Sequence, residues 1–197
     1  SGAWGNCWMK WGPSSIRNDL IDHLVPGGQA DMIIVILNST AGGGCANMST
    51  GTFAAMKGSP VTTYAHEAGH AMHGLMDEYL STAGCAAQVA WTGSEPNQAN
   101  ITATLSPLKW AEFVDPAMPI AAAGGYSGGN YRGNDETGTE CVAEGRWSDT
   151  PAEDAGFGKW STGVFAGARY SRFDLYRPSF KSTMKSNTHP NNDCLLY

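Results

Sequence analysis

Apolar residues recur at helical spacing early in the chain and then gather in a short continuous run. Residues 14–24 carry apolar side chains three or four positions apart, which predicts an amphipathic helix. These side chains are Ile16, Leu20, Ile21 and Leu24. Residues 32–37 form a short run rich in β-branched side chains, which predicts a buried central strand. Residues 52–56 are expected to form another short strand, at the edge of a sheet.

The pattern then predicts one more long helix, followed mostly by loops. A helix is expected from about Tyr64 to Gly74, with Thr62 or Thr63 as its N-terminal cap. A proline at the first position predicts a short helix over residues 107–114. Glycine, serine, asparagine and acidic residues dominate residues 121–167, which are therefore expected to form long loops.

This order of elements predicts an α/β fold of the α+β kind, in one domain over residues 1–197. The upper part is expected over about residues 1–75 and a loop-rich lower part over about residues 76–197. Hydrophobic residues make up 42% of the chain, enough for a sizeable core. The net charge is −6 and the 12 lysines and arginines form no run, which argues against a nucleic-acid binder, since that class needs a basic face. No apolar run approaches the roughly 18 residues of a membrane-spanning helix.

The five cysteines lie far apart and form no C-x-x-C pair, which argues against a structural zinc knuckle. Two disulfides and one free thiol would suit an exported protein, whereas five buried free thiols would suit a cytosolic one. The count does not fix the pairing. No signal peptide begins at Ser1, so we expect a secreted chain in its mature or trimmed form.

Residues 66–70 read His-Glu-Ala-Gly-His and carry the clearest chemical signal. Positions four apart share one face of a helix, so His66 and His70 can reach the same ion. Zinc suits imidazole nitrogen and tolerates an open fourth position. Glu67 lies beside the first ligand, where its carboxylate can take a proton from zinc-bound water and pass it to the leaving amine. The alternative is two histidines and a solvated glutamate on an exposed helix face.

A third protein ligand is expected shortly after this helix. Gly74 can adopt a left-handed conformation that turns the chain back toward the metal. Asp77 is ranked first and Glu78 second, because they are the carboxylates just beyond that turn. His73 is ranked third, because it would lie about 10 Å along the helix from His66. A residue that is not the ligand would instead bond to a ligand or face solvent.

Residues 66–79 resemble the pattern H-E-x-x-H-x-x-x-G-L-x-D-E-Y of the IgA-peptidase family of metallopeptidases. Further segments are similar to that family, in order, from about residue 32 to residue 187. They are residues 35–39 with the glycines at 42–44, Glu95-Pro96-Asn97, Lys109-Trp110, residues 165–170, residues 176–179 and Met184.

The resemblance implies a metzincin-like fold, with a twisted mixed sheet over an active-site helix and a cleft between two lobes. It also implies a methionine turn beneath the metal, for which Met184 is the candidate and core packing the alternative. The common metzincin spacing would put the third ligand at Met76, a poor zinc ligand, whereas the spacing within the IgA-peptidase family points to Asp77. Tyr170 and Tyr176 are candidates for stabilising the developing charge, with aromatic packing as the alternative.

Motif and resemblance together predict a secreted zinc endopeptidase that acts on protein or peptide substrates, as a monomer, with no nucleic-acid or membrane partner. One alternative is a catalytically silent, zinc-stapled module that binds glycan or protein, and another is a zinc hydrolase of a non-peptide amide or ester. Glu67 argues against the silent module, because a purely structural zinc needs no base. Acidic residues between 135 and 154 match no calcium motif, so Ca²⁺ is unsupported and a solvated loop is expected.

Overall fold

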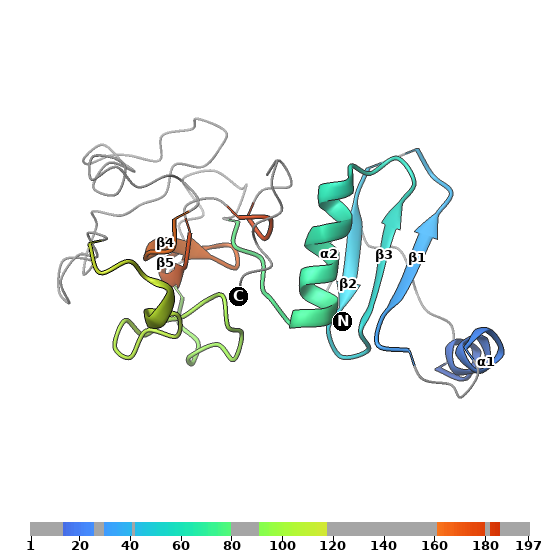
Figure 1. Ribbon diagram of the computed structural model, residues 1–197, viewed down its shortest axis with the longest axis horizontal. Helices are drawn as coiled ribbons and strands as arrows, with labels where there is room; N and C mark the ends of the chain where they lie inside the picture. Colours follow the sequence, from blue (N-terminus) through green and yellow to red (C-terminus); the bar gives the residue numbers. More distant parts are fainter. Residues whose placement is uncertain are drawn as a thin grey trace. The chain divides into compact units, whose positions relative to one another are not determined.

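The computed structural model describes residues 14–25, 30–40, 42–79, 91–117, 161–179 and 182–185 (Figure 1). The chain divides into two compact units, Ser1–Gly74 and Leu75–Tyr197. The organisation as one catalytic domain stays a prediction. The acidic residues weighed as calcium ligands lie outside the described residues, as do all the cysteines except Cys45.

A small mixed sheet organises the first unit. Its strands are β1 (Ile33–Leu37), β2 (Gly44–Asn47) and β3 (Thr52–Met56), in the spatial order β1-β3-β2. Strand β1 runs parallel to β3, with Ile33 opposite Thr52, and β2 runs antiparallel to β3. Both predicted strands exist, but the assignment of centre and edge was wrong. Among the described strands β3 is central, while on β1 Ile34 and Ile36 are exposed.

Two helices accompany this sheet, α1 (Ser14–Leu24) and α2 (Val61–His73). Helix α1 coincides with the predicted span. Helix α2 begins earlier than predicted, because Pro60 and not a threonine is its N-cap residue and no side chain caps it. Proline suits a helix entrance, since its φ, here −64°, is already helical and it has no amide hydrogen to satisfy.

Helix α2 packs on the sheet through one face. Tyr64, Ala68 and Ala71 recur at helical spacing and contact the buried side chains of Phe53 and Ala55 on β3. The Tyr64 hydroxyl also donates a hydrogen bond of 3.1 Å to the carbonyl oxygen of the last β3 residue. At 3.6 residues per turn, the side chains two positions on from Tyr64 and Ala68 point roughly to the other side of the helix. Packing on the sheet therefore turns the face of α2 that carries His66 and His70 away from the sheet.

An antiparallel hairpin anchors the second unit. Strands β4 (Phe165–Ala168) and β5 (Ser171–Arg177) pair with Phe165 opposite Arg177. The sequence-based expectation of loops up to residue 167 was therefore wrong at its end. Leu175 of β5 packs with Ile101 and Ala168 in a fully buried cluster.

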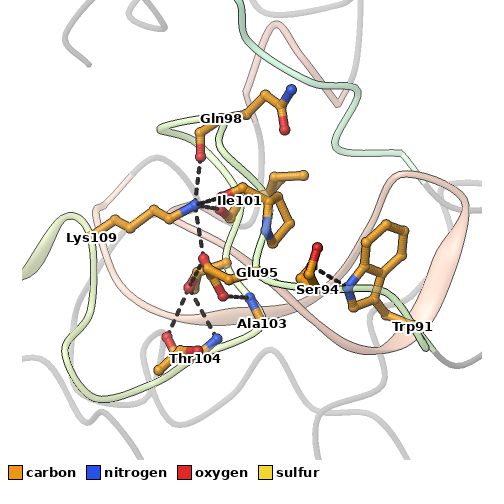
Figure 2. Close-up of polar contacts among 10 residues, drawn as sticks. Trp91, Ser94, Glu95, Gln98, Ile101, Ala103, Thr104 and Lys109 are labelled. Carbon is orange, nitrogen blue, oxygen red and sulfur yellow. Dashed lines mark hydrogen bonds and ion pairs between the residues drawn. The ribbon is translucent and has the colours of Figure 1, made fainter.

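Residues 91–117 form a loop-rich segment built around one lysine (Figure 2). The Lys109 ammonium donates to the carbonyl oxygens of Pro96, Gln98 and Ile101, and it forms a 2.8 Å ion pair with Glu95. The carboxylate of Glu95 in turn accepts hydrogen bonds from the Thr102 hydroxyl and the Ala103 amide. The helix predicted over 107–114 is reduced to the 3-10 helix η2 (Ala111–Phe113). The segment is therefore held together mainly by the hydrogen bonds and the ion pair of Lys109, and less by regular secondary structure.

The described residues form an α+β fold with a small mixed sheet and few helices, which confirms the predicted fold class. In the described part of the chain, no helix is long and apolar enough to cross a membrane.

Candidate metal centre

The two histidines of the motif lie close together on α2. His66 and His70 are buried, and their Nε2 atoms are 3.2 Å apart. Two nitrogens that share a tetrahedral zinc ion at about 2.0–2.1 Å would be about 3.3–3.4 Å apart. The same distance would also suit a hydrogen bond between the rings, so the neighbouring groups decide between the two interpretations.

A carboxylate accompanies the two imidazoles. The ligand atoms of His66, His70 and Asp77 all lie within 4.8 Å of one another and could hold a metal ion. Two nitrogens and one oxygen are a donor set that suits zinc and leaves a fourth position for water or substrate. With this third group, the cluster could hold a metal ion shared by all three side chains.

The end of α2 makes this arrangement possible. Gly74 follows the helix with φ 62° and ψ 23°, and its amide hydrogen bonds back to the carbonyl oxygens of Gly69 and His70. The left-handed conformation predicted for Gly74 is therefore confirmed, and it ends the helix three residues before Asp77. His73, the lowest-ranked ligand candidate, is exposed and is not part of the cluster.

Glu78, the alternative ligand, is also outside the cluster and is fully buried. Its Oε1 accepts a 2.9 Å hydrogen bond from the Asn100 amide, and its Oε2 accepts one from the Ser182 hydroxyl. Burial raises the pKa of Glu78, although these two bonds and the charges of Arg177 and Lys185 oppose the shift. Both carboxylate oxygens are thus engaged with other segments of the chain.

Glu67 is buried beside a glycine of the sheet. A Cβ atom placed on Gly44 would lie 2.7 Å from Cγ of Glu67 and 2.9 Å from its Oε1. Real Cβ atoms do not come so close to other atoms, so the absence of a side chain at residue 44 leaves the space that Glu67 occupies. Strand β2 and helix α2 together therefore set the position of this carboxylate.

Tyr170 contacts the segment that carries Asp77. Its hydroxyl donates to Oδ2 of Asp77 across 3.5 Å and lies 3.0 Å from the Tyr79 hydroxyl. Two backbone bonds join the same segments, from the Arg169 amide to the Asp77 carbonyl and from the Tyr170 amide to the Tyr79 carbonyl. Burial raises the pKa of Tyr79, and its bond to Tyr170 and the charge of Asp77 add to this, so the phenol stays protonated.

Tyr176 and Met184 lie in different surroundings from Tyr170. Tyr176 packs with Val164 in a buried cluster, and burial followed by the charge of Asp174 raises its pKa. Met184 is fully buried in a turn, and its carbonyl oxygen accepts a 2.9 Å bond from the Glu78 amide.

Sequence reasoning missed two residues that shape this region, Asn100 and Ser182. The Asn100 side chain bonds to both backbone groups of Met76 at 2.8–2.9 Å as well as to Glu78. No local pattern identifies either residue, because their partners lie 22 and 104 positions away along the chain. The roles of this fully buried asparagine and this buried serine become apparent only in the tertiary structure.

Comparison with known proteins accounts for this constellation. The family described as IgA Peptidase M64 matches residues 21–195, which include all three residues of the metal cluster and Glu67. No curated protein matches the sequence. A match over most of the chain shows common descent and, with it, the general activity of a peptidase. The chain belongs to the IgA Peptidase M64 family.

Proposed function

We propose that this protein is a zinc-dependent endopeptidase, in which His66, His70 and Asp77 hold the metal and Glu67 is the catalytic base. One observation carries the proposal: three ligand atoms lie within 4.8 Å of one another, and two of them flank Glu67 on the same helix. Membership of a peptidase family supports the same conclusion.

The residues present fit a zinc ion. The 3.2 Å separation of the imidazole nitrogens is close to what zinc requires, and buried imidazoles are held in place for a ligand. When bound, zinc would acidify a water molecule and polarise the scissile carbonyl group. Asp77 is preferred over Glu78 because the oxygens of Glu78 already accept hydrogen bonds from Asn100 and Ser182.

Glu67 supplies the acid–base chemistry of the proposed reaction. Its carboxylate takes a proton from the attacking water and gives that proton to the leaving amine when the peptide bond breaks. The tight contact with Gly44 limits where this carboxylate can lie. Tyr170 is proposed to donate a hydrogen bond to the developing negative charge, since its hydroxyl already reaches Asp77. Tyr176 is the weaker candidate for that task, because it packs in a core cluster.

The edge of the sheet offers a place for an extended peptide. Among the described strands, β2 lies at one edge of its sheet, next to β3. A peptide added there would lie next to Gly44 and hence beside Glu67. Main-chain pairing of this kind suits an enzyme that cuts within a polypeptide.

The remaining expectations belong to the same proposal. We propose a secreted monomer with two disulfides and one free thiol, and a methionine turn at Met184 beneath the metal. The turn conformation and full burial of Met184 support the last of these. Thiol titration of the unfolded protein tests the disulfides, because it should show one reactive thiol without reductant and five with it.

Metal content and proteolysis, measured together on the wild type and Glu67→Gln, test the central proposal. About one zinc per chain is expected in both proteins, while cleavage of a diverse peptide mixture should fall by about 10²- to 10⁴-fold in the variant. Zinc in both proteins without cleavage in either would favour the silent binding module. Cleavage of an ester or a non-peptide amide alone would favour the other hydrolase, and absence of zinc from the wild type would refute the proposal.

A further inference from the structure

The turn that joins β4 and β5 has an unusual composition for its conformation. Arg169 and Tyr170 are its two central residues, between the paired residues Ala168 and Ser171, and both have positive φ, 48° and 63°. A two-residue hairpin turn with positive φ at both positions normally takes asparagine and glycine, because larger side chains are strained there. Contacts with neighbouring residues must therefore offset the backbone strain at Arg169 and Tyr170. Strain kept in this way points to a functional role for their side chains.

The side chain of Arg169 is held over an aromatic ring. Its guanidinium carbon lies 4.9 Å from the centroid of the Trp91 ring. The ring is itself fixed, because its indole nitrogen donates a 3.1 Å bond to the Ser94 carbonyl (Figure 2) and its carbons pack against a buried cluster. A guanidinium held over a ring is attracted to its face, and the N–H groups that do not face the ring can still bind a ligand.

Arg169 is also exposed and close to the proposed metal ligand. Its amide donates a 2.9 Å hydrogen bond to the carbonyl oxygen of Asp77, so the start of this side chain is fixed relative to the ligand segment. Within the described ranges, no aspartate or glutamate forms an ion pair with Arg169. A positive charge positioned in this way lacks a carboxylate partner from the described part of the chain.

We propose that Arg169, held over the Trp91 ring, is a substrate subsite that binds a carboxylate of the peptide near the bond to be cut. Arginine is suited to this, because its planar edge can donate two parallel hydrogen bonds to one carboxylate. The carboxylate comes either from an acidic side chain or from the C-terminus of the substrate. The subsite determines which peptides are preferred and rests on the proposed peptidase function.

Arg169→Asn is the sharpest variant, because asparagine suits a positive φ better than arginine does. The thermal midpoint of unfolding should stay the same or rise, while recognition of carboxylates is lost. Arg169→Lys keeps the charge without the planar fork and should be intermediate. Lys57→Asn, at an exposed position of the first unit, removes the same charge elsewhere and serves as the control.

Matched peptides separate the two sources of the carboxylate. The cut sites of a diverse peptide mixture first give a preferred sequence, and synthetic versions then carry glutamate or glutamine, and a free or amidated C-terminus. Arg169→Asn should lower kcat/KM for the preferred carboxylate peptide at least about tenfold relative to its neutral partner, the effect of one charge-assisted hydrogen bond. Lys57→Asn should leave this ratio unchanged.

Binding of the same peptides to Glu67→Gln and to Glu67→Gln combined with Arg169→Asn, measured by calorimetry, separates this proposal from the peptidase proposal. A defined glutamate peptide and its glutamine counterpart serve as probes if the wild type cuts nothing. A carboxylate preference that depends on Arg169 would then support the subsite while the peptidase function fails. Equal use and equal binding of charged and neutral peptides by the wild type, or a preference that survives in Arg169→Asn, would overturn the subsite.

Discussion

The position of Glu67 depends on a residue that lacks a side chain. A Cβ atom on Gly44 would meet Glu67 and would also lie 3.0 Å from the backbone oxygen of Ala54, which cannot move aside as a side chain can. Glu67 would then have to give way. The requirement at residue 44 is therefore one of space beside the proposed base, separate from any preference of the strand for a particular residue.

Gly44→Ala is expected to displace Glu67 while leaving the metal ligands intact. A shift of the order of 1 Å in a catalytic group can lower the rate by about 100-fold, so kcat/KM should fall by about 10- to 100-fold with zinc content unchanged. Gly42→Ala is the matched control, because a Cβ atom there would meet nothing within 4 Å. Equal activity of the two variants would show that Glu67 does not depend on this contact.

The motif predicts the arrangement of its own residues but does not identify the third ligand. The spacing of His66, Glu67 and His70 fixes their relation on a helix, because helical geometry repeats every 3.6 residues. The choice between Asp77 and Glu78 is not local in the same way. We propose Asp77 because the carboxylate of Glu78 is buried against Asn100 and Ser182, which are distant in sequence.

At the scale of elements, Glu78 ties together three segments that have no regular secondary structure in common. Its side chain joins residues 75–79 to Asn100 and to the 182–185 turn, and its amide bonds to the carbonyl of Met184. Because Asp77 is the preceding residue, these bonds restrain the backbone that carries the proposed third ligand. We therefore expect Glu78 to act as a positioning residue, through Asp77.

Glu78→Ala should weaken zinc binding by about 10- to 100-fold, the usual effect of removing a group that supports a metal ligand. Titration with a competing chelator measures this, and the absorption bands of the cobalt-substituted protein should change with the ligand geometry. Glu78→Gln retains the shape and part of the hydrogen bonding, so it should restore most of the affinity. Glu112→Ala, at an exposed position of η2, is the control. Unchanged zinc affinity in folded Glu78→Ala would contradict the assignment.

The hairpin β4–β5 shows why some elements escape prediction. Its turn carries Arg169 and Tyr170 in place of the usual asparagine and glycine, so the local sequence lacks the signal by which hairpins are recognised. Contacts with Asp77, Tyr79 and Trp91 stabilise the turn instead. The position of β3 at the centre of its sheet is likewise a matter of pairing, which residue preference does not specify.

At the scale of the whole molecule, acid should destabilise the fold partly through Glu95. Burial works to raise the pKa of Glu95, but the bonds from Lys109, Thr102 and Ala103 outweigh it and hold this pKa below its ordinary value. A carboxylate with a lowered pKa in the folded state stabilises the fold above about pH 4.5, and this stabilisation is lost as the pH falls further. The loop around Lys109 should therefore loosen in acid.

Glu95→Gln should lower the thermal midpoint of unfolding near neutral pH and make its decline below about pH 4.5 shallower than in the wild type. Scanning calorimetry between about pH 7 and about pH 3 measures both effects. Glu112→Gln removes an exposed carboxylate and should follow the wild-type curve. An unchanged acid limb in Glu95→Gln would show that the Lys109 cluster does not contribute to acid stability.

The sequence by itself determined the features that depend on near neighbours in the chain. These are the helix at 14–24, the existence but not the start of the helix at 61–73, the left-handed turn at Gly74, the histidine pair with its glutamate, and the resemblance that family comparison confirmed. Helical period and motif spacing involve residues close together in the chain, so they can be recognised without knowledge of the fold. Tertiary structure alone decided the order of the strands, the engagement of Glu78, the space at Gly44 and the placement of Arg169 over Trp91. Each of these depends on packing between segments far apart in sequence, where burial and hydrogen bonding select one arrangement from many that local preference allows.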